Sequence, residues 1–352
     1  MSCTQCTDVN MYENEGFIIM FSRFPEIIRA ILPAIDPTNI RSSEATTCTV
    51  EYHSIEQLLQ TFEAIHTIVE EQFGSKIELY TSIEDKQQQQ ARFPQMLPFA
   101  EIYSRVKQPK LFHVIKESYF TNHIQPIISL KDDKIVGYEF LLRSSHPEFP
   151  FTPYELFTFS QSAGLQAMLD GNARKQAIKY GSENLTKGML RFINFLPSSI
   201  YNPKHCLQST FENIEKYNVD PSDLVFEVVE TEKIHDVSHL QAIFEAYKHE
   251  GINVALDDIG AGYSTIELLE ELRPNYAKID RELISFCDQS TDKLDRLKRI
   301  IEVAKAYDIK TLAEGIERRE ELELCRALGY DFAQGYYIGK PSPKPLTLVE
   351  LP

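Results

Sequence analysis

The sequence predicts an α/β protein in which a TIM-barrel-like (β/α)8 domain with an antiparallel first strand follows a small N-terminal α/β domain. Eight short apolar runs, rich in β-branched and aromatic residues, follow one another from His123 onward. From the second run onward, stretches with helical periodicity separate the runs, which indicates a mostly parallel sheet. The first two runs are joined by a connection too short for a crossover helix, so we expect them to form an antiparallel hairpin.

The number of runs favours a closed barrel, because eight strands within about 230 residues fit this architecture. An open, doubly wound sheet is the alternative. It predicts a glycine fingerprint in its first strand–helix turn. The corresponding segment, KDDKIVG at residues 131–137, is not such a fingerprint.

Length, charge and cysteine content narrow the class of protein. The 352 residues suffice for one small domain and one of roughly 250 residues. No run approaches the ~18 apolar residues that a membrane span needs, and the first residues do not resemble a signal peptide. The net charge of −16 argues against polymeric nucleic acid or an anionic membrane as the main partner. We therefore expect a cytoplasmic protein with reduced thiols, in which the single CxxC at Cys3 and Cys6 is a weak metal or redox signal.

The N-terminal domain is expected at residues 1–83, with a β-α-β-α-β order from Gly16 to about Ser82. Its long second helix should be capped by Ser54, with Gln57 completing a capping box. The domain contains neither a glycine-rich phosphate loop nor clustered carboxylates or histidines. Its chemistry is therefore not indicated, and a regulatory role is the expectation.

Residues 84–112 are expected to join the two domains. Four consecutive glutamines, Gln87–Gln90, indicate a polar linker. A helical pattern then runs from Leu97 to Ser118, and Pro109 should kink it or end its first part. The barrel domain is assigned to residues 113–352.

The barrel strands are assigned to the apolar runs in chain order: HIQPIISL, IVGYEFLLR, MLRFINFL, LVFEVVE, INVALDDI, YAKID, IKTLAEG and FAQGYYIG. Among the intervening helices, one is expected to start with Ser238 as its cap and to stop at Gly251. The segments DRLKRIIEVAKAYDI and RREELELCRALGY predict two more.

A polar residue interrupts every strand after the first, mostly toward its C-terminal end: Glu139, Asn194, Glu227, Asp257 with Asp258, Lys278, Glu314 and Gln334. A single one of these would be read as a helix cap or a satisfied polar group. Their recurrence on successive strands is better explained by a shared site, because active sites of such barrels lie at the C-terminal ends of the strands.

The adjacent carboxylates Asp257 and Asp258 require a cation, since desolvating an ionised carboxylate costs several kcal/mol. Neighbouring residues of a strand point to opposite faces, so Asp258 must leave regular strand geometry to reach the same site as Asp257. Gly260 and Gly262 make such a departure possible.

The candidate ligands are carboxylate and amide oxygens, which select a hard cation such as Mg²⁺ or Mn²⁺ over zinc. So many carboxylates are too much charge for one ion, so two ions sharing Asp257 are expected. Two such ions about 3.5–4 Å apart clamp a phosphoryl oxygen and activate water. The predicted reaction class is therefore phosphodiester hydrolysis.

These motifs resemble, in order and spacing, those of the EAL-domain family. The resemblance covers roughly His113–Pro343 and rests on QPII, YEFLLR, INF, EVVE, DDIGAGYST, KID, AEGIE and QGYYIGKP. It implies a TIM-barrel-like fold with an antiparallel first strand. It also implies hydrolysis of cyclic di-GMP to the linear dinucleotide pGpG with Mg²⁺ or Mn²⁺.

The resemblance further assigns roles to single residues. The implied ligands of one ion are Glu139, Asn194, Glu227 and Asp257, and those of the second are Asp257, Asp258 and Glu314. Glu314 is alternatively the general base, and Lys278 would orient the water and stabilise charge at the phosphate. The remaining implied roles are substrate contact for Gln125 and Arg143, a place beside the ions for Gln334, and positioning of the loop after the fifth strand for Glu230 and Glu317.

The resemblance also implies a homodimer through Tyr263–Leu272, although an amphipathic helix packed on its own barrel explains this segment equally well. The sequence departs from the family pattern at Phe140, where alanine is usual, and at Val229, where threonine is usual. Ile259 and Ala261 also differ from the usual residues, but no ligand is lost. Two alternatives to an enzyme follow: a degenerate domain that binds cyclic di-GMP without cleaving it, and a protein-interaction platform.

Overall fold

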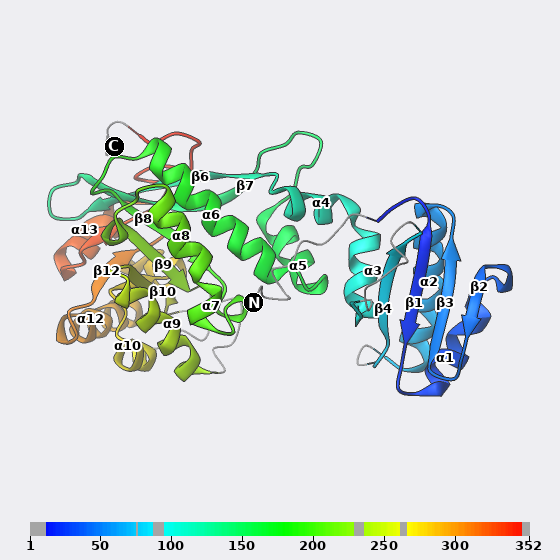
Figure 1. The fold of residues 1–352 in the computed structure, drawn as a ribbon. Coiled ribbons are helices and arrows are strands. Elements are labelled where there is room, and N and C mark those ends of the chain that lie inside the picture. The colour runs from blue at the N-terminus through cyan, green and yellow to red at the C-terminus, as the bar shows by residue number, and fades with distance from the viewer. Residues whose placement is uncertain (1–11, 75–76, 87–94, 229–235, 261–265, 347–352) are drawn as a thin grey trace. The chain divides into compact units, whose positions relative to one another are not determined.

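The computed structural model describes residues 12–74, 77–86, 95–228, 236–260 and 266–346 (Figure 1). These residues form two compact units. The N-terminal unit extends to Tyr119 and also includes His146–Gln166, whereas the barrel unit contains Phe120–Ser145 and the chain from Ala167 onward. None of the helices in the described ranges is long and apolar enough to cross a membrane.

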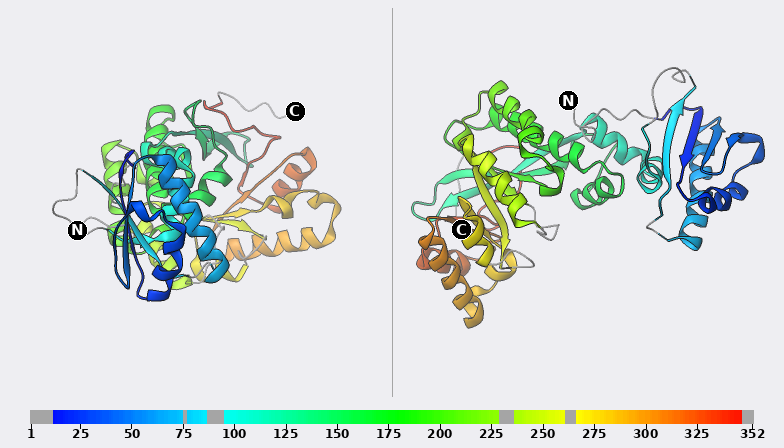
Figure 2. Two further views of the ribbon diagram at one scale, coloured as in Figure 1. Left: turned by 90° about the vertical axis from the view of Figure 1, so that its right-hand side faces the viewer. Right: turned by 60° about the horizontal axis from the view of Figure 1, so that its bottom comes forward.

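The N-terminal unit is built on a five-stranded antiparallel sheet in the order β2-β3-β1-β4-β5. The strands are β1 (Gly16–Phe21), β2 (Ile40–Ser43), β3 (Thr47–Tyr52), β4 (Tyr80–Asp85) and β5 (Leu97–Pro98). The helices are α1 (Pro25–Ile31), α2 (Ile55–Gln72), α3 (Phe99–Lys107), α4 (Pro109–Glu117) and α5 (Pro153–Ser162), with 3₁₀ turns η1 (Leu32–Ala34) and η2 (Pro37–Asn39). From β1 to β4 the order is that of the split β-α-β-β-α-β motif, with α1 and α2 on one face of the sheet (Figure 2).

The predicted β-α-β-α-β order found the larger elements of this unit but omitted β2 and β5. β2 has only four residues, and most of them are exposed, so it carries no alternating apolar pattern. Ser54 caps α2 as expected, because its hydroxyl accepts a hydrogen bond from the N–H of Gln57 at 3.1 Å.

The stretch expected to connect the domains consists of two helices. Pro109 occupies the first turn of α4 and separates it from α3, as its lack of an N–H group predicts. Phe99 of α3 stacks on Phe62 of α2 with ring centroids 5.2 Å apart. α3 therefore packs in the core of the N-terminal unit.

The barrel unit is a closed eight-stranded barrel, which confirms the predicted fold class. Its strands are β6 (Phe120–Ser129), β7 (Ile135–Ser144), β8 (Leu190–Phe195), β9 (Leu224–Val228), β10 (Asn253–Ile259), β11 (Tyr276–Ile279), β12 (Lys310–Ala313) and β13 (Phe332–Ala333). β6 runs antiparallel to both neighbours, β7 and β13, while the other pairs are parallel.

Helices cover the outside of the barrel (Figure 1): α6 (Gln166–Asn184), α7 (Pro203–Cys206), α8 (Gln208–Lys216), α9 (Val237–His249), α10 (Ile266–Leu272), α11 (Arg281–Ile284), α12 (Thr291–Ala306) and α13 (Arg319–Leu328). Short 3₁₀ turns are η3 (Pro197–Ser199), η4 (Pro221–Asp223) and η5 (Cys287–Gln289). The expected cap of α9, Ser238, is wrong. Asp236 caps this helix instead, because its carboxylate accepts the N–H of His239 at 2.9 Å.

An apolar layer of buried side chains fills the barrel interior: Ile127, Phe192, Val225, Ala255, Tyr276 and Leu312. Side chains of a strand alternate between its faces, so the residue two positions later points to the same side. Two positions after Phe192, Val225, Ala255, Tyr276 and Leu312 stand Asn194, Glu227, Asp257, Lys278 and Glu314. The polar residues predicted from the strand ends therefore form the next layer toward the C-terminal rim.

Candidate active site

Lys278 lies at the centre of this polar layer. Its ammonium group lies 2.9 Å from Glu314 Oε1, 3.1 Å from Asp257 Oδ1 and 3.6 Å from Glu139 Oε1. It also pairs with Glu227 Oε2. Lys278 is 1% exposed and Glu227 is 0% exposed, so this ion cluster is largely withdrawn from water.

Amide side chains lie around Glu139. Gln334 Nε2 donates to Glu139 Oε2 at 2.6 Å, and Asn194 Nδ2 donates to Glu139 Oε1 at 3.4 Å. Gln125 of β6 pairs with Glu139 across the β6–β7 ladder, and its amide donates to the carbonyl of Gly339 at 3.1 Å. The antiparallel strand β6 thus brings Gln125 beside the carboxylate of Glu139 on β7.

Asp257 and Asp258 reach the same site through an irregularity in β10. Leu256 pairs with Ala277 and Ile259 with Ile279, so two residues of β10 face the single residue Lys278 of β11. This two-against-one count is a bulge. Asp258 has φ of 54°, in the left-handed region that aspartate tolerates better than most residues. The expected departure of Asp258 from strand geometry is confirmed.

Burial and charge act in opposite directions on the ionisable groups. Burial raises the pKa of Glu227 well above its ordinary value, although Lys278 lowers it. Burial likewise raises the pKa of Glu314, again against the effect of Lys278. For Lys278, burial alone would lower the pKa, but the carboxylates around it raise it well above the ordinary value. Four carboxyl groups contact this one ammonium group, so when all four are ionised they carry more negative charge than it balances.

The same residues satisfy the donor chemistry of a hard divalent cation. Carboxylate oxygens of Asp257, Asp258 and Glu314 lie within 4.8 Å of one another. Glu227 Oε1 and Gln334 Oε1 are buried without a hydrogen-bond partner. Unpaired buried acceptors are costly, and oxygen donors of this kind suit Mg²⁺ or Mn²⁺.

Sequence comparison places this geometry in a known family. The family model for the EAL domain matches residues 110–341. The chain belongs to the EAL-domain family. Because the match spans both the antiparallel hairpin and the acidic rim, the resemblance inferred from the motifs is confirmed.

Similar proteins include two from Escherichia coli K12. The probable cyclic di-GMP phosphodiesterase PdeB is 30% identical over 247 residues, covering 69% of this chain and 47% of PdeB. The cyclic di-GMP phosphodiesterase PdeF is 27% identical over 245 residues, covering 69% of this chain and 32% of PdeF. This chain thus matches less than half the length of either relative.

A solved structure of an EAL protein has the same fold. A standalone EAL protein from Vibrio cholerae O395, in its cyclic di-GMP-bound form, is 31% identical, with a TM-score of 0.59. The similarity covers 66% of this chain and 95% of that protein. It is therefore confined largely to the EAL barrel.

Other residues implied by the EAL resemblance lie outside the ion cluster. Arg143 follows Glu139 by four residues on β7, pairs with Thr121 in the ladder and donates to the carbonyl of Leu142 at 2.7 Å. Glu317 forms an ion pair with Arg281 of α11 at 2.8 Å. Glu230, Val229, Gly262 and Tyr263–Thr265 lie outside the described residues.

The departure at Phe140 is accommodated on the outer face of β7. The ring is buried and meets Tyr180 of α6 edge-on, with centroids 6.0 Å apart. A Cβ atom at Gly181 would lie only 3.2 Å from Phe140 Cζ, so the glycine leaves room for the ring. The larger side chain is thereby accommodated on the side of the strand opposite to Glu139.

The sequence motifs do not include Glu321 of α13, whose carboxylate is buried and accepts hydrogen bonds from backbone N–H groups three and four residues after Glu314. Its signal in the sequence is only a glutamate near a helix start. That pattern predicts a cap and indicates nothing about a site.

Proposed function

We propose that the EAL barrel of this protein hydrolyses cyclic di-GMP to linear pGpG in a reaction that depends on Mg²⁺ or Mn²⁺. The convergence of Glu139, Asn194, Glu227, Asp257, Asp258 and Glu314 on one rim carries the proposal, because every oxygen donor expected of the site is present. The names of PdeB and PdeF and the nucleotide bound by the Vibrio protein support cyclic di-GMP as substrate.

Two ions are proposed at this rim. Glu139, Asn194, Glu227 and Asp257 would hold one, while Asp257, Asp258 and Glu314 would hold the other. When bound, the ions would polarise a phosphoryl oxygen and make water more acidic. Gln334 would lie beside the ions and offer them its buried Oε1, which has no hydrogen-bond partner.

Protein side chains supply proton transfer, charge stabilisation and substrate binding. As the alternative to holding the second ion, Glu314 accepts the proton of the attacking water, a role consistent with the raised pKa of its carboxyl group. Lys278, 2.9 Å away, orients this water and stabilises negative charge that develops on the phosphate. Arg143 and Gln125, on the paired strands β7 and β6, bind a substrate phosphate and the nucleotide.

Product analysis tests the proposal. The purified chain is incubated with cyclic di-GMP in Mg²⁺, Mn²⁺ or EDTA, and the linear dinucleotide is resolved by chromatography. The proposal requires product with Mg²⁺ or Mn²⁺ and none in EDTA. Bound but intact nucleotide in every metal would instead identify a receptor, and the absence of both binding and product would leave an interaction platform.

The other roles remain predictions. The N-terminal unit is proposed to regulate the barrel, since the EAL match begins only at residue 110. Pairing through Tyr263–Leu272 also stays a prediction: of its described part, Leu269 and Leu272 are buried in the barrel's own core. Sedimentation velocity over a range of concentrations would test the pairing. The cytoplasmic location likewise stays a prediction.

A further inference from the structure

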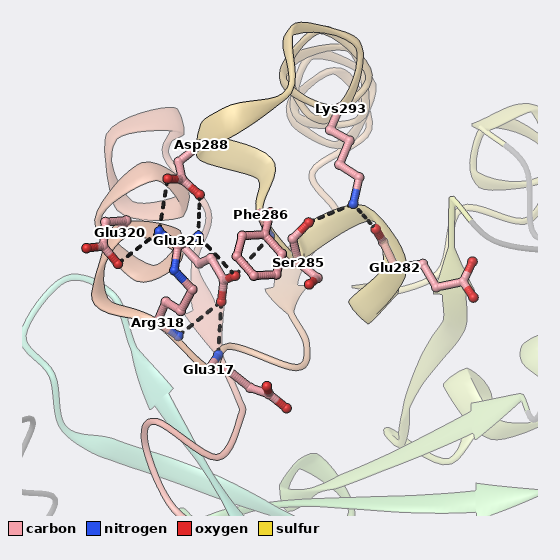
Figure 3. Close-up of polar contacts among 9 residues, drawn as sticks. All are labelled: Glu282, Ser285, Phe286, Asp288, Lys293, Glu317, Arg318, Glu320 and Glu321. Atoms are coloured by element: carbon pink, nitrogen blue, oxygen red, sulfur yellow. Dashed lines mark hydrogen bonds and ion pairs between the residues drawn. The ribbon is translucent and has the colours of Figure 1, made fainter.

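The carboxylate of Glu321 lies where two segments that leave the active-site strands meet (Figure 3). The first segment, residues 280–289, follows β11, the strand that carries Lys278, and contains α11 and η5. The second, residues 314–318, follows β12 and begins with Glu314. Glu321 belongs to neither segment, but stands in the first turn of α13 and is 1% exposed.

Both segments donate backbone hydrogen bonds to this carboxylate. Its Oε1 accepts the N–H of Phe286 at 2.9 Å, and its Oε2 accepts those of Glu317 at 3.0 Å and Arg318 at 3.1 Å. A helix cap explains only the bond from Arg318, the residue before α13. The bond from Phe286 comes from a different segment, so the carboxylate links the two.

Phe286, which donates to this carboxylate, has an unfavourable backbone conformation. Phe286 has φ of 52°, a left-handed conformation that a bulky residue rarely adopts. Such a conformation persists where the surroundings impose it. Phe286 is 53% exposed and its ring lies under the Arg318 guanidinium at 4.8 Å, so burial of the side chain does not impose this conformation.

Arg318 and Lys293 reinforce the same arrangement from outside (Figure 3). Arg318 forms a two-bond fork with Asp288, at 2.8 and 3.1 Å, which fastens the start of α13 to η5. Lys293 of α12 donates to the carbonyl of Ser285 at 2.6 Å and to that of Glu282. The segment after β11 is therefore held on both sides of Phe286.

The segment after β12 is held at its other end by the barrel. The N–H of Glu314 donates to the carbonyl of Ile279 at 3.1 Å, and that of Ile316 donates to the carbonyl of Gln334 at 3.0 Å. Glu321 adds the bonds to Glu317 and Arg318, immediately beyond. Glu321 therefore anchors the C-terminal end of the short segment that begins with Glu314.

We infer that Glu321 is a positioning residue for the proposed hydrolysis, which ties the two segments together and so sets the place of Glu314 relative to Lys278. The inference rests on the proposed function. Glu321 contacts neither the ion cluster nor the substrate in this role. Loss of such an outer partner typically costs about 10- to 100-fold in metal affinity or activity.

The substitution Glu321→Gln tests the inference with almost no change in shape. An amide offers one acceptor oxygen and one NH2 donor, so in either orientation the donor would face a backbone N–H. Glu320→Gln is the matched control, because Glu320 is the preceding residue, is 61% exposed in its side chain and contacts Arg318 at 3.2 Å. Thermal unfolding of both variants sets a temperature at which each is fully folded.

At that temperature, kcat and KM for cyclic di-GMP are measured with Mn²⁺. Glu321→Gln should lower kcat by about 10- to 100-fold and leave KM within about threefold, since the substrate contacts are unchanged. Glu320→Gln should stay within about twofold of the wild type in both. A variant that unfolds at a lower temperature but keeps its kcat within twofold would show that Glu321 only stabilises the fold, and would overturn the inference.

Two further measurements keep the result decisive. If Glu321→Gln does not fold, hydrogen exchange of the wild-type protein is measured with and without Mn²⁺. Mn²⁺ should slow exchange of the backbone N–H groups of Phe286 and Glu317 together. Unchanged exchange at these two residues overturns the inference. If the wild type makes no product, the proposed hydrolysis fails. Mn²⁺ affinity then decides on Glu321, and equal affinities in the wild type and Glu321→Gln overturn the inference.

Discussion

Replacing Lys278 by methionine tests how the carboxylate cluster is balanced in the absence of metal. The ammonium group is buried and contacts Glu139, Glu227, Asp257 and Glu314. Methionine keeps most of the apolar stem but removes the charge. Removing one partner of a buried ion pair costs about 3–5 kcal/mol, because the other charge is left uncompensated. At about 2–4 °C per kcal/mol, the midpoint of thermal unfolding should fall by roughly 6–20 °C.

The assay is thermal unfolding followed by circular dichroism, first in EDTA and then with Mn²⁺. Lys278→Met should unfold at the lower temperature in EDTA. Mn²⁺ should raise its midpoint more than that of the wild type, because no ammonium group competes for the carboxylates. An ion at about 100 times its Kd adds about 2.7 kcal/mol of stability.

Lys298→Met provides the control, since Lys298 is half exposed on α12 and pairs only loosely with Asp295 at 3.7 Å. Its midpoint should change little, as expected for an exposed pair. If Lys278→Met in EDTA unfolded at the same temperature as the wild type, the ammonium group would not balance the cluster.

Other predictions concern single residues of the site and of the β7 strand. Glu314→Gln should reduce product formation by about 100- to 10,000-fold while calorimetry still detects nucleotide binding; unchanged turnover would remove Glu314 from its proposed role. Burial raises the pKa of Glu227 above 4.5, so the stability it contributes to the metal-free protein is present below pH 4.5 and lost as the pH rises through the raised pKa. The midpoint of thermal unfolding of Glu227→Gln minus that of the wild type should therefore be larger at pH 8 than at pH 4.5. A difference that does not change with pH would contradict this. Phe140→Ala should cost about 3–5 kcal/mol in denaturant unfolding yet leave kcat of the folded protein within twofold, because the ring packs against α6; a large loss of kcat at unchanged stability would be inconsistent with that packing.

The barrel and the rim residues could be predicted because both depend on periodicity along the chain. Alternation within a strand places Glu227 two residues after Val225, and Asp257 two residues after Ala255, on the inner face. The strand–helix repeat then brings these positions to one end of the barrel. The bulge at Asp258 could also be expected, because two adjacent carboxylates cannot share a face of a regular strand.

The rest depends on contacts between residues far apart in sequence. Gly181 leaves room for Phe140 only because α6 packs on β7. The acceptor role of Glu321 toward Phe286 spans 35 residues and involves a backbone N–H, which no side-chain pattern reveals. In the N-terminal unit, β2 is short and exposed, so pairing with β3 decides its conformation.

Divalent ions are proposed to join the carboxylates of Glu139, Glu227, Asp257 and Glu314 to a phosphodiester. Crystals grown with Mn²⁺ and cyclic di-GMP, measured at a wavelength where manganese scatters anomalously, test this proposal most directly. Anomalous peaks are expected within coordination distance of Glu139, Asn194, Glu227 and Asp257, with a phosphate oxygen of the nucleotide or its linear product among the ligands. Manganese bound elsewhere, or a nucleotide phosphate remote from these side chains, would contradict it.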